Sequence, residues 1–594
     1  MDIQSIVEAD ILRSIAELYP GTAGVVQLTP TKKEFEGQYT FVTFPYTKVL
    51  RQAPAQIGQV IGNWLLANSA VVSAFNVVQG FLNISIADAA WLNVLNDIAA
   101  NPSFGTLPKK GQSVMVEFSS PNTNKPLHLG HLRNNFLGDS VSRILAASGY
   151  DVVKTCIVND RGVHICKSML AYRLFGNGET PDSAGMKGDH LIGKYYVLFD
   201  KAYKAQIEEM VSQGTAKEEA EKRAPLMLEV QQMLRLWEQG DPETVALWRK
   251  LNDWVYAGFD TTYKTIGVTF DKTYYESNTY LLGKEIVEEG IQKGVFYRKE
   301  DNSVWIDLTE EGLDQKLVLR SDGTSVYMTQ DLGTTDLKFQ DFRSDRQIWV
   351  VGNEQDYHFN VLFAILRRLG RPYASELYHL SYGMVDLPTG KMKSREGTVV
   401  DADDLIQETT DAASTAADEA AKGKLDEFDE AEKKALFQML GLGALKYYLL
   451  KVDPQKRMQF NPAESVDLHG NTGPYIQYVY ARIQSILRKA RERNIVAQGT
   501  VLATQLDDVE QQLVFLLSQY PQRVSEAGTD FAPSYVAQYA YELAKTFNQF
   551  YDKLSILQET DAVKLHGRLI LSKTVGETIR KAMGLLGIDV PERM

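Results

Sequence analysis

The feature that most constrains the fold is the stretch of residues 114–153, VMVEFSSPNTNKPLHLGHLRNNFLGDSVSRILAASGYDVV. It begins with apolar residues at the two-residue spacing of a strand and breaks at Ser-Ser-Pro. From about Gly130, apolar residues recur every three or four positions, which is the period of an amphipathic helix. A second strand pattern follows at residues 151–158. This order predicts a strand–helix–strand crossover, the unit from which parallel α/β sheets are built.

The turn between the first strand and the helix holds two histidines, His128 and His131, with Gly130 between them. A helix N-terminus presents free backbone N–H groups and the positive end of the helix dipole, and it therefore favours phosphate. Imidazoles there can donate hydrogen bonds to phosphate oxygens whose charge grows in a transition state. The glycine lets a flat ring or a ribose approach the backbone closely. The simpler alternative is a pair of surface histidines near a turn, but the position between strand and helix favours phosphate binding.

Composition limits the class of protein. Of the 594 residues, 44% are hydrophobic and 23% are charged, as in an ordinary globular protein of several domains. The N-terminal segment is an acidic amphipathic helix rather than a targeting peptide, and no apolar run is long enough to span a bilayer. We therefore expect a cytoplasmic protein with no membrane partner. Two cysteines exclude a disulfide framework and a multi-cysteine zinc site, and we expect no structural metal.

Three domains are predicted. Residues 1–108 mix helical and strand patterns and end in a linker with Pro, Gly and Lys, so we expect a small accessory α/β domain. Residues 109–405 contain the crossover and further strands, interrupted at about 180–275 by a long, charged helical insertion. Residues 406–594 are helical in pattern. The predicted fold class is multidomain α/β, with a parallel-sheet catalytic domain, a small N-terminal α/β domain and an all-α C-terminal domain.

Polar residues follow several predicted strands, at the edge where open parallel sheets bind ligands. Asp160 follows the second strand, and it either faces a ligand or caps the helix that begins near Val163. Tyr327 and Asp331 stand at positions i and i+4, which places them on one side of a helix or turn. A later strand–turn–helix junction carries Gly352, Gln355 and His358.

A basic turn, Lys391-Met392-Lys393-Ser394-Arg395, follows a strand pattern. It is either a solvated turn or a mobile loop that grips phosphate. Together with the histidine pair it gives two phosphate-binding elements in one α/β domain. This combination predicts activation of a carboxylate by ATP, through positioning and charge stabilisation of an in-line displacement without a protein nucleophile.

The C-terminal region carries a helix with an apolar face and several arginines and lysines elsewhere. A net charge of −13 argues against a nucleic-acid partner, but only weakly, because a local basic surface can bind RNA on an acidic protein. Aromatic residues beside basic ones suit stacking on unpaired bases, whereas the alternative is an ordinary helix bundle with core tyrosines. The candidate RNA-binding residues are Asn471, Tyr475, Tyr478 and Arg482.

Over essentially its whole length the chain resembles arginyl-tRNA synthetases, which are class I aminoacyl-tRNA synthetases. The resemblance rests on VEFSSPNTNKPLHLGHLRNN, YMTQDLG, VVGNEQDYHF, GKMKSREGTVV, LHGNTGPYIQYVYARI and LLGIDVPERM, in this order. It implies a Rossmann-type catalytic domain, an N-terminal domain that contacts the tRNA elbow and a helical anticodon-binding domain. It also implies that L-arginine is activated with ATP and Mg²⁺ to arginyl-adenylate and transferred to the terminal adenosine of tRNA(Arg). We expect a monomer, and the resemblance further implies that adenylate formation needs bound tRNA.

The resemblance also implies roles for individual residues. Those implied in catalysis are Lys125, His128, His131, Lys391 and Lys393. Those implied in ATP binding are Gly130, Gly352, His358, Met392, Ser394 and Arg395. Those implied in arginine binding are Glu117, Ser120, Asn122, Tyr327, Asp331 and Gln355.

The chemistry of the residues agrees with arginine as the substrate. A guanidinium group has five donors in a rigid plane, which suit the carboxylates of Glu117 and Asp331 and the hydroxyl of Tyr327, whereas the compact ammonium of lysine fits them poorly. Class I enzymes usually carry Lys-Met-Ser-Lys in the mobile loop, and here Ser394 takes the fourth position. Which of Lys125, Lys391, Lys393 and Arg395 grips the pyrophosphate therefore stays open.

Two alternatives to this function differ in class. One is a class I enzyme or a nucleotidylyltransferase with a different substrate, which explains the Tyr327 and Asp331 pair poorly. The other is a non-catalytic RNA-binding paralogue, which should have lost His128, His131 or the lysines of the basic turn. All of these residues are present.

Overall fold

The computed structural model describes residues 2–22, 24–32, 34–386, 400–421, 427–502 and 505–594. At its centre lies a five-stranded sheet of order β12-β11-β5-β6-β7, in which every neighbouring pair is parallel. The strands are β5 (Ser113–Glu117), β6 (Asp151–Val158), β7 (Lys272–Tyr275), β11 (Arg346–Gly352) and β12 (Leu377–Tyr382). The strand order reverses between β5 and β11, and ligands bind at the carboxyl edge of such a switch point. The predicted parallel sheet is confirmed.

Helix α5 (Leu129–Ala147) crosses from β5 to β6 as predicted. Its apolar residues, among them Leu132 and Phe136, lie in the same core as Val114 and Val116 of β5. The expectation of an amphipathic helix was wrong for the polar side, because polar and charged residues there are buried as well. They are covered because α17, α21, α22 and α23 of the C-terminal region pack against α5.

The other face of the sheet is covered by the second half of the α/β region. Met115 of β5 and Trp349 of β11 belong to a separate core, shared with helices of this half. The strand patterns after residue 295 form a small antiparallel sheet of order β10-β9-β8. The elements are α12 (Glu276–Thr279), α13 (Lys284–Gln292), β8 (Tyr297–Arg298), β9 (Val304–Ile306), β10 (Lys316–Leu319), α14 (Tyr327–Phe342) and α15 (Asp356–Arg368).

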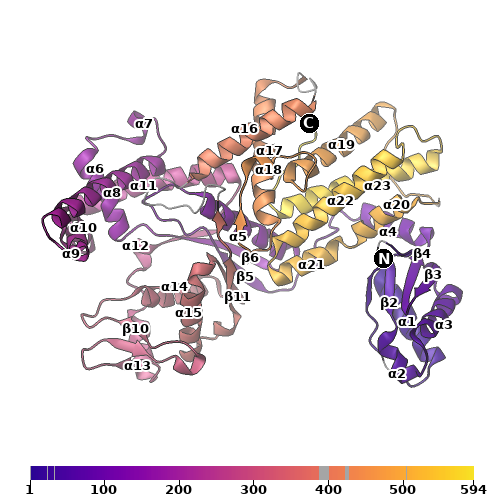
Figure 1. The fold of residues 1–594 in the computed structure, drawn as a ribbon, viewed down its shortest axis with the longest axis horizontal. Coiled ribbons are helices and arrows are strands. Elements are labelled where there is room, and N and C mark those ends of the chain that lie inside the picture. Colours follow the sequence, from indigo (N-terminus) through magenta and orange to yellow (C-terminus); the bar gives the residue numbers. More distant parts are fainter. Residues whose placement is uncertain (1, 23, 33, 387–399, 422–426, 503–504) are drawn as a thin grey trace.

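A group of helices between β6 and β7 extends to one side of the molecule, at the left of Figure 1. It contains the helices of the predicted insertion and the preceding helix α6. The elements are α6 (Val163–Phe175), α7 (Pro181–Ala184), α8 (Gly188–Ser212), α9 (Lys217–Arg223), α10 (Pro225–Glu238) and α11 (Pro242–Ile266). The insertion thus lies within a single crossover of the parallel sheet.

The N-terminal region is a four-stranded antiparallel sheet of order β1-β2-β4-β3 with helices, and it lies at the lower right of Figure 1. It touches the C-terminal helices, where the ring of Tyr39 lies 5.4 Å from that of Phe515. The elements are α1 (Ile3–Leu18), β1 (Leu28–Pro30), β2 (Tyr39–Val42), α2 (Thr47–Leu50), α3 (Pro54–Asn68), β3 (Val72–Val78), β4 (Phe81–Ile86) and α4 (Asp88–Ala100).

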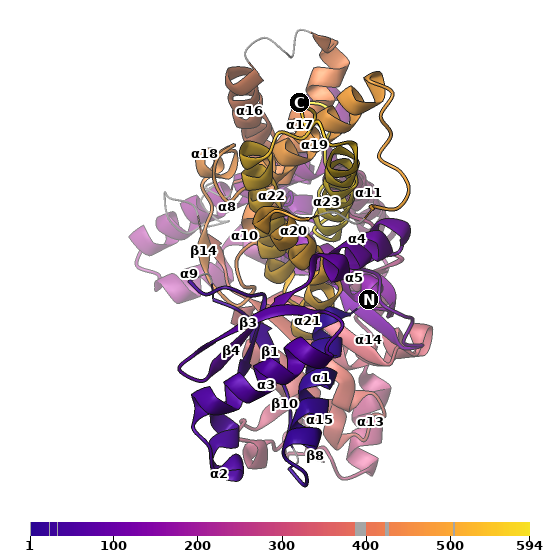
Figure 2. The same ribbon diagram turned by 90° about the vertical axis from the view of Figure 1, so that its right-hand side faces the viewer.

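The C-terminal region is a set of packed helices, seen in the upper half of Figure 2. One short strand departs from the predicted all-α pattern: β14 (Met458–Gln459) pairs in parallel with β13 (Val385–Asp386). The helices are α16 (Ala402–Ala421), α17 (Glu430–Leu450), α18 (Pro462–Ser465), α19 (Gly473–Glu492), α20 (Asp508–Ser518), α21 (Tyr520–Asp530), α22 (Pro533–Lys553) and α23 (Ala562–Leu585). In the ranges that the structure describes, no helix combines the length and the apolar character needed to cross a bilayer.

Candidate active site

The turn after β5 is strained and firmly held. Ser119 and Ser120 have φ angles of 80° and 45°, in the left-handed region that disfavours residues with side chains. The Ser119 N–H donates to the side-chain oxygen of Asn134 on α5 at 2.5 Å, and the Ser119 hydroxyl lies 2.6 Å from that of Tyr263. The backbone that carries the predicted arginine contacts Ser120 and Asn122 is therefore fixed at the switch point. The Asn122 side chain is exposed.

Helix α5 begins with two neutral histidines. His128 is the N-cap, and its Nδ1 accepts a hydrogen bond from the Gly130 N–H at 3.1 Å. The Nδ1 of His131 accepts from the His128 N–H at 3.1 Å, and the two rings lie 3.9 Å apart. Because each Nδ1 accepts, each Nε2 carries the ring proton and can donate. Burial and the charge of Lys125 lower the pKa of His128 to about 3. Burial, the neighbouring His128 ring and the charge of Lys125 lower the pKa of His131.

Gly130 makes room for the histidine motif itself. A Cβ atom at this position would lie 3.0 Å from Cε1 of the His128 ring. This finding adds a second reason for the glycine, and room for an approaching ligand stays a prediction. Gly352 is less constrained, since a Cβ there would meet Met384 Sδ at an ordinary 3.6 Å. Burial lowers the pKa of Lys125, which stands three positions before His128.

The predicted arginine contacts on α14 lie one turn apart. The side chain of Tyr327 is 76% exposed at the first residue of the helix. The Asp331 carboxylate lies 2.7 Å from Nε2 of His358 on α15. We predicted His358 for ATP, and the structure places it against an arginine-binding candidate instead, so its ATP role stays a prediction. Gln355 is exposed immediately before α15.

Glu117 at the end of β5 is buried. Its carboxylate forms an ion pair with Lys338 of α14, and both side chains are less than a tenth exposed. A buried ion pair needs such close partners because desolvation of each charge is costly. The pair ties β5 to the helix that carries Tyr327 and Asp331. Contact between Glu117 and arginine stays a prediction.

Sequence reasoning missed Glu276, which immediately follows β7 and begins α12. Its side chain is 17% exposed, and its carboxylate lies 3.9 Å from the guanidinium of Arg161. Burial is the main cause that raises the pKa of Glu276 to about 7; Arg161 opposes the rise, and the charges of Asp160 and Asp331 add to it. A buried carboxyl group whose pKa is raised in this way is a candidate functional-site residue. Its position at the carboxyl end of a parallel strand was the available signal.

Asp160 has a structural function that neither sequence alternative foresaw. It is 1% exposed, and its carboxylate accepts hydrogen bonds from the Tyr256 hydroxyl at 2.8 Å and from the backbone N–H of Ser277 at 2.8 Å. The N-cap of α6 is Gly162, without a side-chain cap. Asp160 therefore joins the end of β6 to α11 and α12, and so supports Glu276.

The basic turn of Lys391, Met392, Lys393, Ser394 and Arg395 lies outside the described residues. Residues 401 and 402 contact the loop before α5. The Ala402 N–H donates to the Leu127 carbonyl at 2.9 Å, and Asp401 forms an antiparallel bridge with His128.

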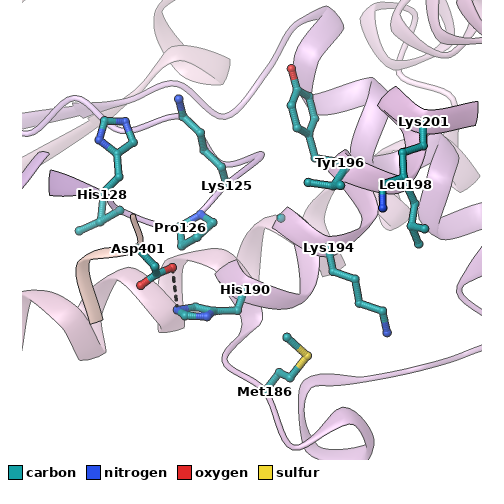
Figure 3. A pocket seen from close by; sticks show the side chains of 13 residues that line it. Lys125, Pro126, His128, Met186, His190, Lys194, Tyr196, Leu198, Lys201 and Asp401 are labelled. Carbon is teal, nitrogen blue, oxygen red and sulfur yellow. Dashed lines mark ion pairs between the residues drawn. The ribbon is translucent and has the colours of Figure 1, made fainter. Parts of the chain in front are cut away.

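A cavity of about 410 Å³ lies beside His128 (Figure 3). The loop before α5, helix α8 and Asp401 line it together. Its lining includes the lysines Lys125, Lys194 and Lys201, along with several apolar side chains. A cavity with cations beside apolar surface is suited to an anionic ligand with a flat ring.

Among the residues that the structure describes, one group has the spacing of metal ligands: Asp189, His190 and Asp403. The ammonium of Lys187 forms ion pairs with both of these carboxylates. Because a lysine supplies the cation, we interpret the group as an ion network and assign no metal to it.

Two of the four predicted RNA-binding residues, Tyr478 and Arg482, lie together on a basic, aromatic surface. The guanidinium of Arg482 lies 4.9 Å from the ring centroid of Tyr478 and 4.7 Å from that of Tyr551 on α22. Tyr478 and Arg482 line a cavity of about 670 Å³, together with Lys489 and Arg493. This surface combines exposed cations and aromatic rings, as stacking on unpaired bases requires.

The other two RNA-binding candidates hold helices together. The Tyr475 hydroxyl accepts from the Asn548 amide of α22 at 3.0 Å, and the Asn471 side-chain oxygen accepts from the Tyr447 hydroxyl at 2.5 Å. Neither residue lines the cavity beside Arg482. Their contact with RNA stays a prediction.

Comparisons with known proteins agree with the fold. Residues 95–461 match the family "tRNA synthetases class I (R), catalytic domain", and residues 476–594 match "DALR anticodon binding domain". Arginine–tRNA ligases of Bacteroides thetaiotaomicron and Phocaeicola vulgatus are 55% and 56% identical, over 100% of both chains in each case. The structure of Thermus thermophilus arginyl-tRNA synthetase is 25% identical with a TM-score of 0.78, and it too covers 100% of both chains. The chain therefore belongs to the arginyl-tRNA synthetase family.

Proposed function

We infer that the protein is an arginine–tRNA ligase, which activates L-arginine with ATP and charges tRNA(Arg). The inference rests on the side chains at the carboxyl edge of the parallel sheet. Neutral imidazole donors begin α5, while the carboxylates of Asp331 and Glu276 stand on elements at the same carboxyl edge of the sheet. Phosphate donors and guanidinium acceptors at one edge are what the joining of ATP to arginine requires.

The first step is attack by the arginine carboxylate on the α-phosphorus of ATP. The α–β phosphoanhydride bond breaks, pyrophosphate leaves and arginyl-adenylate forms. Because the Nε2–H groups of His128 and His131 are neutral donors, they stabilise the charge on the phosphate oxygens without exchanging a proton. Lys125 adds a positive charge beside them, and in the second step a hydroxyl of the terminal adenosine attacks the arginyl carbonyl and releases AMP.

Selection of arginine depends on acceptors around the guanidinium. We propose that Asp331 and Glu276 provide the carboxylates, that Tyr327 adds its hydroxyl, and that His358 orients Asp331 through its hydrogen bond. The remaining predicted contacts, Glu117, Ser120, Asn122 and Gln355, would bind the rest of the amino acid. Lysine carries its charge on a compact ammonium and cannot make the forked contacts of a guanidinium.

Further parts of the proposal concern partners and setting. We propose that ATP enters with Mg²⁺ on its phosphates, since Mg²⁺ is held largely by substrate phosphates in sites of this kind. The surface of Tyr478, Arg482 and Lys489 would bind RNA bases. The domain limits at residues 108 and 405, a monomeric state and a cytoplasmic location remain expectations from the sequence.

An aminoacylation assay tests the proposed function. The purified protein is incubated with ATP, Mg²⁺, a total tRNA pool and each amino acid in turn, and the charged tRNA is sequenced. We expect arginine alone to be attached, and only to arginine acceptor tRNAs. Charging with a different amino acid, or no charging with any of them, would contradict the proposal.

A further inference from the structure

An ion network joins two segments that are more than two hundred positions apart: the start of α8 and the start of α16. The Nε2 atom of His190 lies 3.3 Å from the Asp401 carboxylate and 3.0 Å from that of Asp403. Lys187 forms a second ion pair with Asp403 and donates a hydrogen bond to Thr262 of α11 at 2.7 Å. Helices of the insertion thus hold the beginning of α16 from two sides, and Figure 3 shows the pair of His190 with Asp401.

Residues 400–402, at the start of α16, are hydrogen-bonded to the loop that carries His128. The Ala402 N–H donates to the Leu127 carbonyl at 2.9 Å, and the Leu129 N–H donates to the Val400 carbonyl at 3.4 Å. His128 lies between these two bonds and forms a bridge with Asp401. The backbone of Asp401 therefore sets the position of the His128 backbone, and its side chain is held by His190.

The network is partly buried: the side chains of Lys187, His190 and Asp403 are 26%, 24% and 29% exposed, and that of Asp401 is 11% exposed. Asp189 is fully buried, and its nearest cation is the ammonium of Lys187 at 3.4 Å. The hydroxyl of Thr262 donates to Asp403 at 3.0 Å, and the backbone N–H of Asp403 donates to Asp401 at 2.8 Å. Three carboxylates thus depend on Lys187 and His190, so loss of either side chain leaves a partly or fully buried carboxylate with fewer partners.

Helix α8 also rests directly on the loop. A Cβ atom at Gly193 would lie 2.9 Å from Cδ of Pro126, so only glycine allows this approach. The loop before α5 is consequently held between α8 on one side and residues 400–402 on the other.

We propose that His190 and Lys187 are positioning residues for ATP: they hold Asp401 and Asp403 and thereby fix the backbone of residues 127–129, which places His128 and Lys125 against the phosphates. Neither residue touches the reacting atoms in this assignment. The proposal rests on the proposed function, because it assumes that His128 binds ATP. The class I reaction depends on positioning, and a displacement of about 1 Å can cost roughly 10²-fold in rate.

The test is a double-mutant cycle on arginine-dependent ATP–pyrophosphate exchange with tRNA present. His190→Ala, Asp403→Asn and the double variant are compared with the wild type, with KM and kcat measured separately for ATP and for arginine. We expect each single variant to lower kcat/KM for ATP by about 10- to 100-fold while KM for arginine changes by less than about twofold. The double variant should lose less than the product of the two single losses, because both changes remove the ion pair between His190 and Asp403.

The matched control is His164→Ala. His164 lies on α6, and its Nδ1 is 3.0 Å from the Tyr196 hydroxyl of α8, so this variant loosens α8 without touching Asp401 or Asp403. We expect it to keep the wild-type KM for ATP. Should His190→Ala unfold, His190→Phe, which fills the space of the ring but has no N–H donor, is measured in its place.

The outcomes separate two failures. Losses that multiply in the double variant, or a KM for arginine that rises by as much as kcat/KM for ATP falls, would overturn the positioning assignment and leave the proposed function intact. Absence of arginine-dependent exchange in the wild type would overturn the proposed function itself.

Discussion

Glu276→Gln tests most directly whether the Glu276 carboxylate binds the guanidinium group of the substrate arginine. Burial raises the pKa of Glu276 to about 7. Among the described residues, the cation paired with it is the Arg161 guanidinium, 3.9 Å away. The difference between about 7 and the ordinary value of 4.5 corresponds to roughly 3 kcal/mol that opposes ionisation in the free protein. A bound guanidinium would recover part of this free energy, because a cation beside the carboxylate favours its charged form.

Ionisation of Glu276 makes arginine binding depend on pH. Arginine binds the ionised carboxylate, so its binding lowers the pKa of Glu276 and releases a proton. The affinity for arginine is therefore highest well above pH 7 and falls as the pH drops below about 7. At pH 6 about one tenth of the free protein carries the ionised group, and KM for arginine should be about tenfold higher than at pH 8.

The assay is arginine-dependent pyrophosphate exchange at pH 6, 7 and 8. Glu276→Gln should raise KM for arginine at pH 8 by about 10- to 100-fold, as expected for one lost hydrogen bond between charged groups, and should remove the pH dependence. Glu311→Gln, in an ion pair with Arg368 outside the site, serves as the control and should behave as the wild type. A Gln variant that keeps the wild-type KM, or that keeps the rise in KM at pH 6, would refute the reasoning.

Three further predictions follow from the same contacts. Asp331→Ala should raise KM for arginine steeply and leave KM for ATP nearly unchanged; an unchanged arginine dependence would remove Asp331 from the specificity site. His131→Ala should lower kcat by about 10²–10³-fold, the usual loss for one transition-state donor, and a wild-type rate would end that role. Lys338→Met leaves the Glu117 carboxylate buried without its cation, so stability should fall by about 3–5 kcal/mol. Thermal unfolding measures this loss, and an unchanged midpoint would show that the pair contributes nothing.

Much of the catalytic centre could be predicted from the sequence because its information is local. The alternation of apolar residues before residue 118 and the helical period after Gly130 placed β5, α5 and β6, and the structure has all three. The N-terminal position of His128 on α5 also follows from the local pattern. The fixed tautomers of the two rings did not, because they depend on two backbone N–H groups that only the folded turn brings to Nδ1.

What the sequence did not reveal depends on contacts between distant segments. Glu276 is separated from the first strand by the whole helical insertion. Its pKa is raised mainly by burial, with the charges of Asp160 and Asp331 adding to the rise and Arg161 opposing it. The burial of the polar side of α5 likewise comes from C-terminal helices. Local periodicity contains neither fact, since it reports which face of an element is apolar and not what will cover the other face.

The pairing of Asp331 with His358 is a similar case. The sequence places each residue at the start of its own helix, and only the packing of α14 on α15 brings them to 2.7 Å. The contact with Asp331 could therefore not be predicted from the motif that contains His358.

The central claim is that the carboxyl edge between β5 and β11 joins ATP to arginine. The most direct measurement is ATP–pyrophosphate exchange by the wild-type protein, with each amino acid in turn, with and without a tRNA pool. We predict exchange with arginine alone and only when tRNA is present. Exchange with another amino acid, or no exchange with any amino acid, would contradict the claim. Arginine-dependent exchange without tRNA would contradict only the coupling to tRNA.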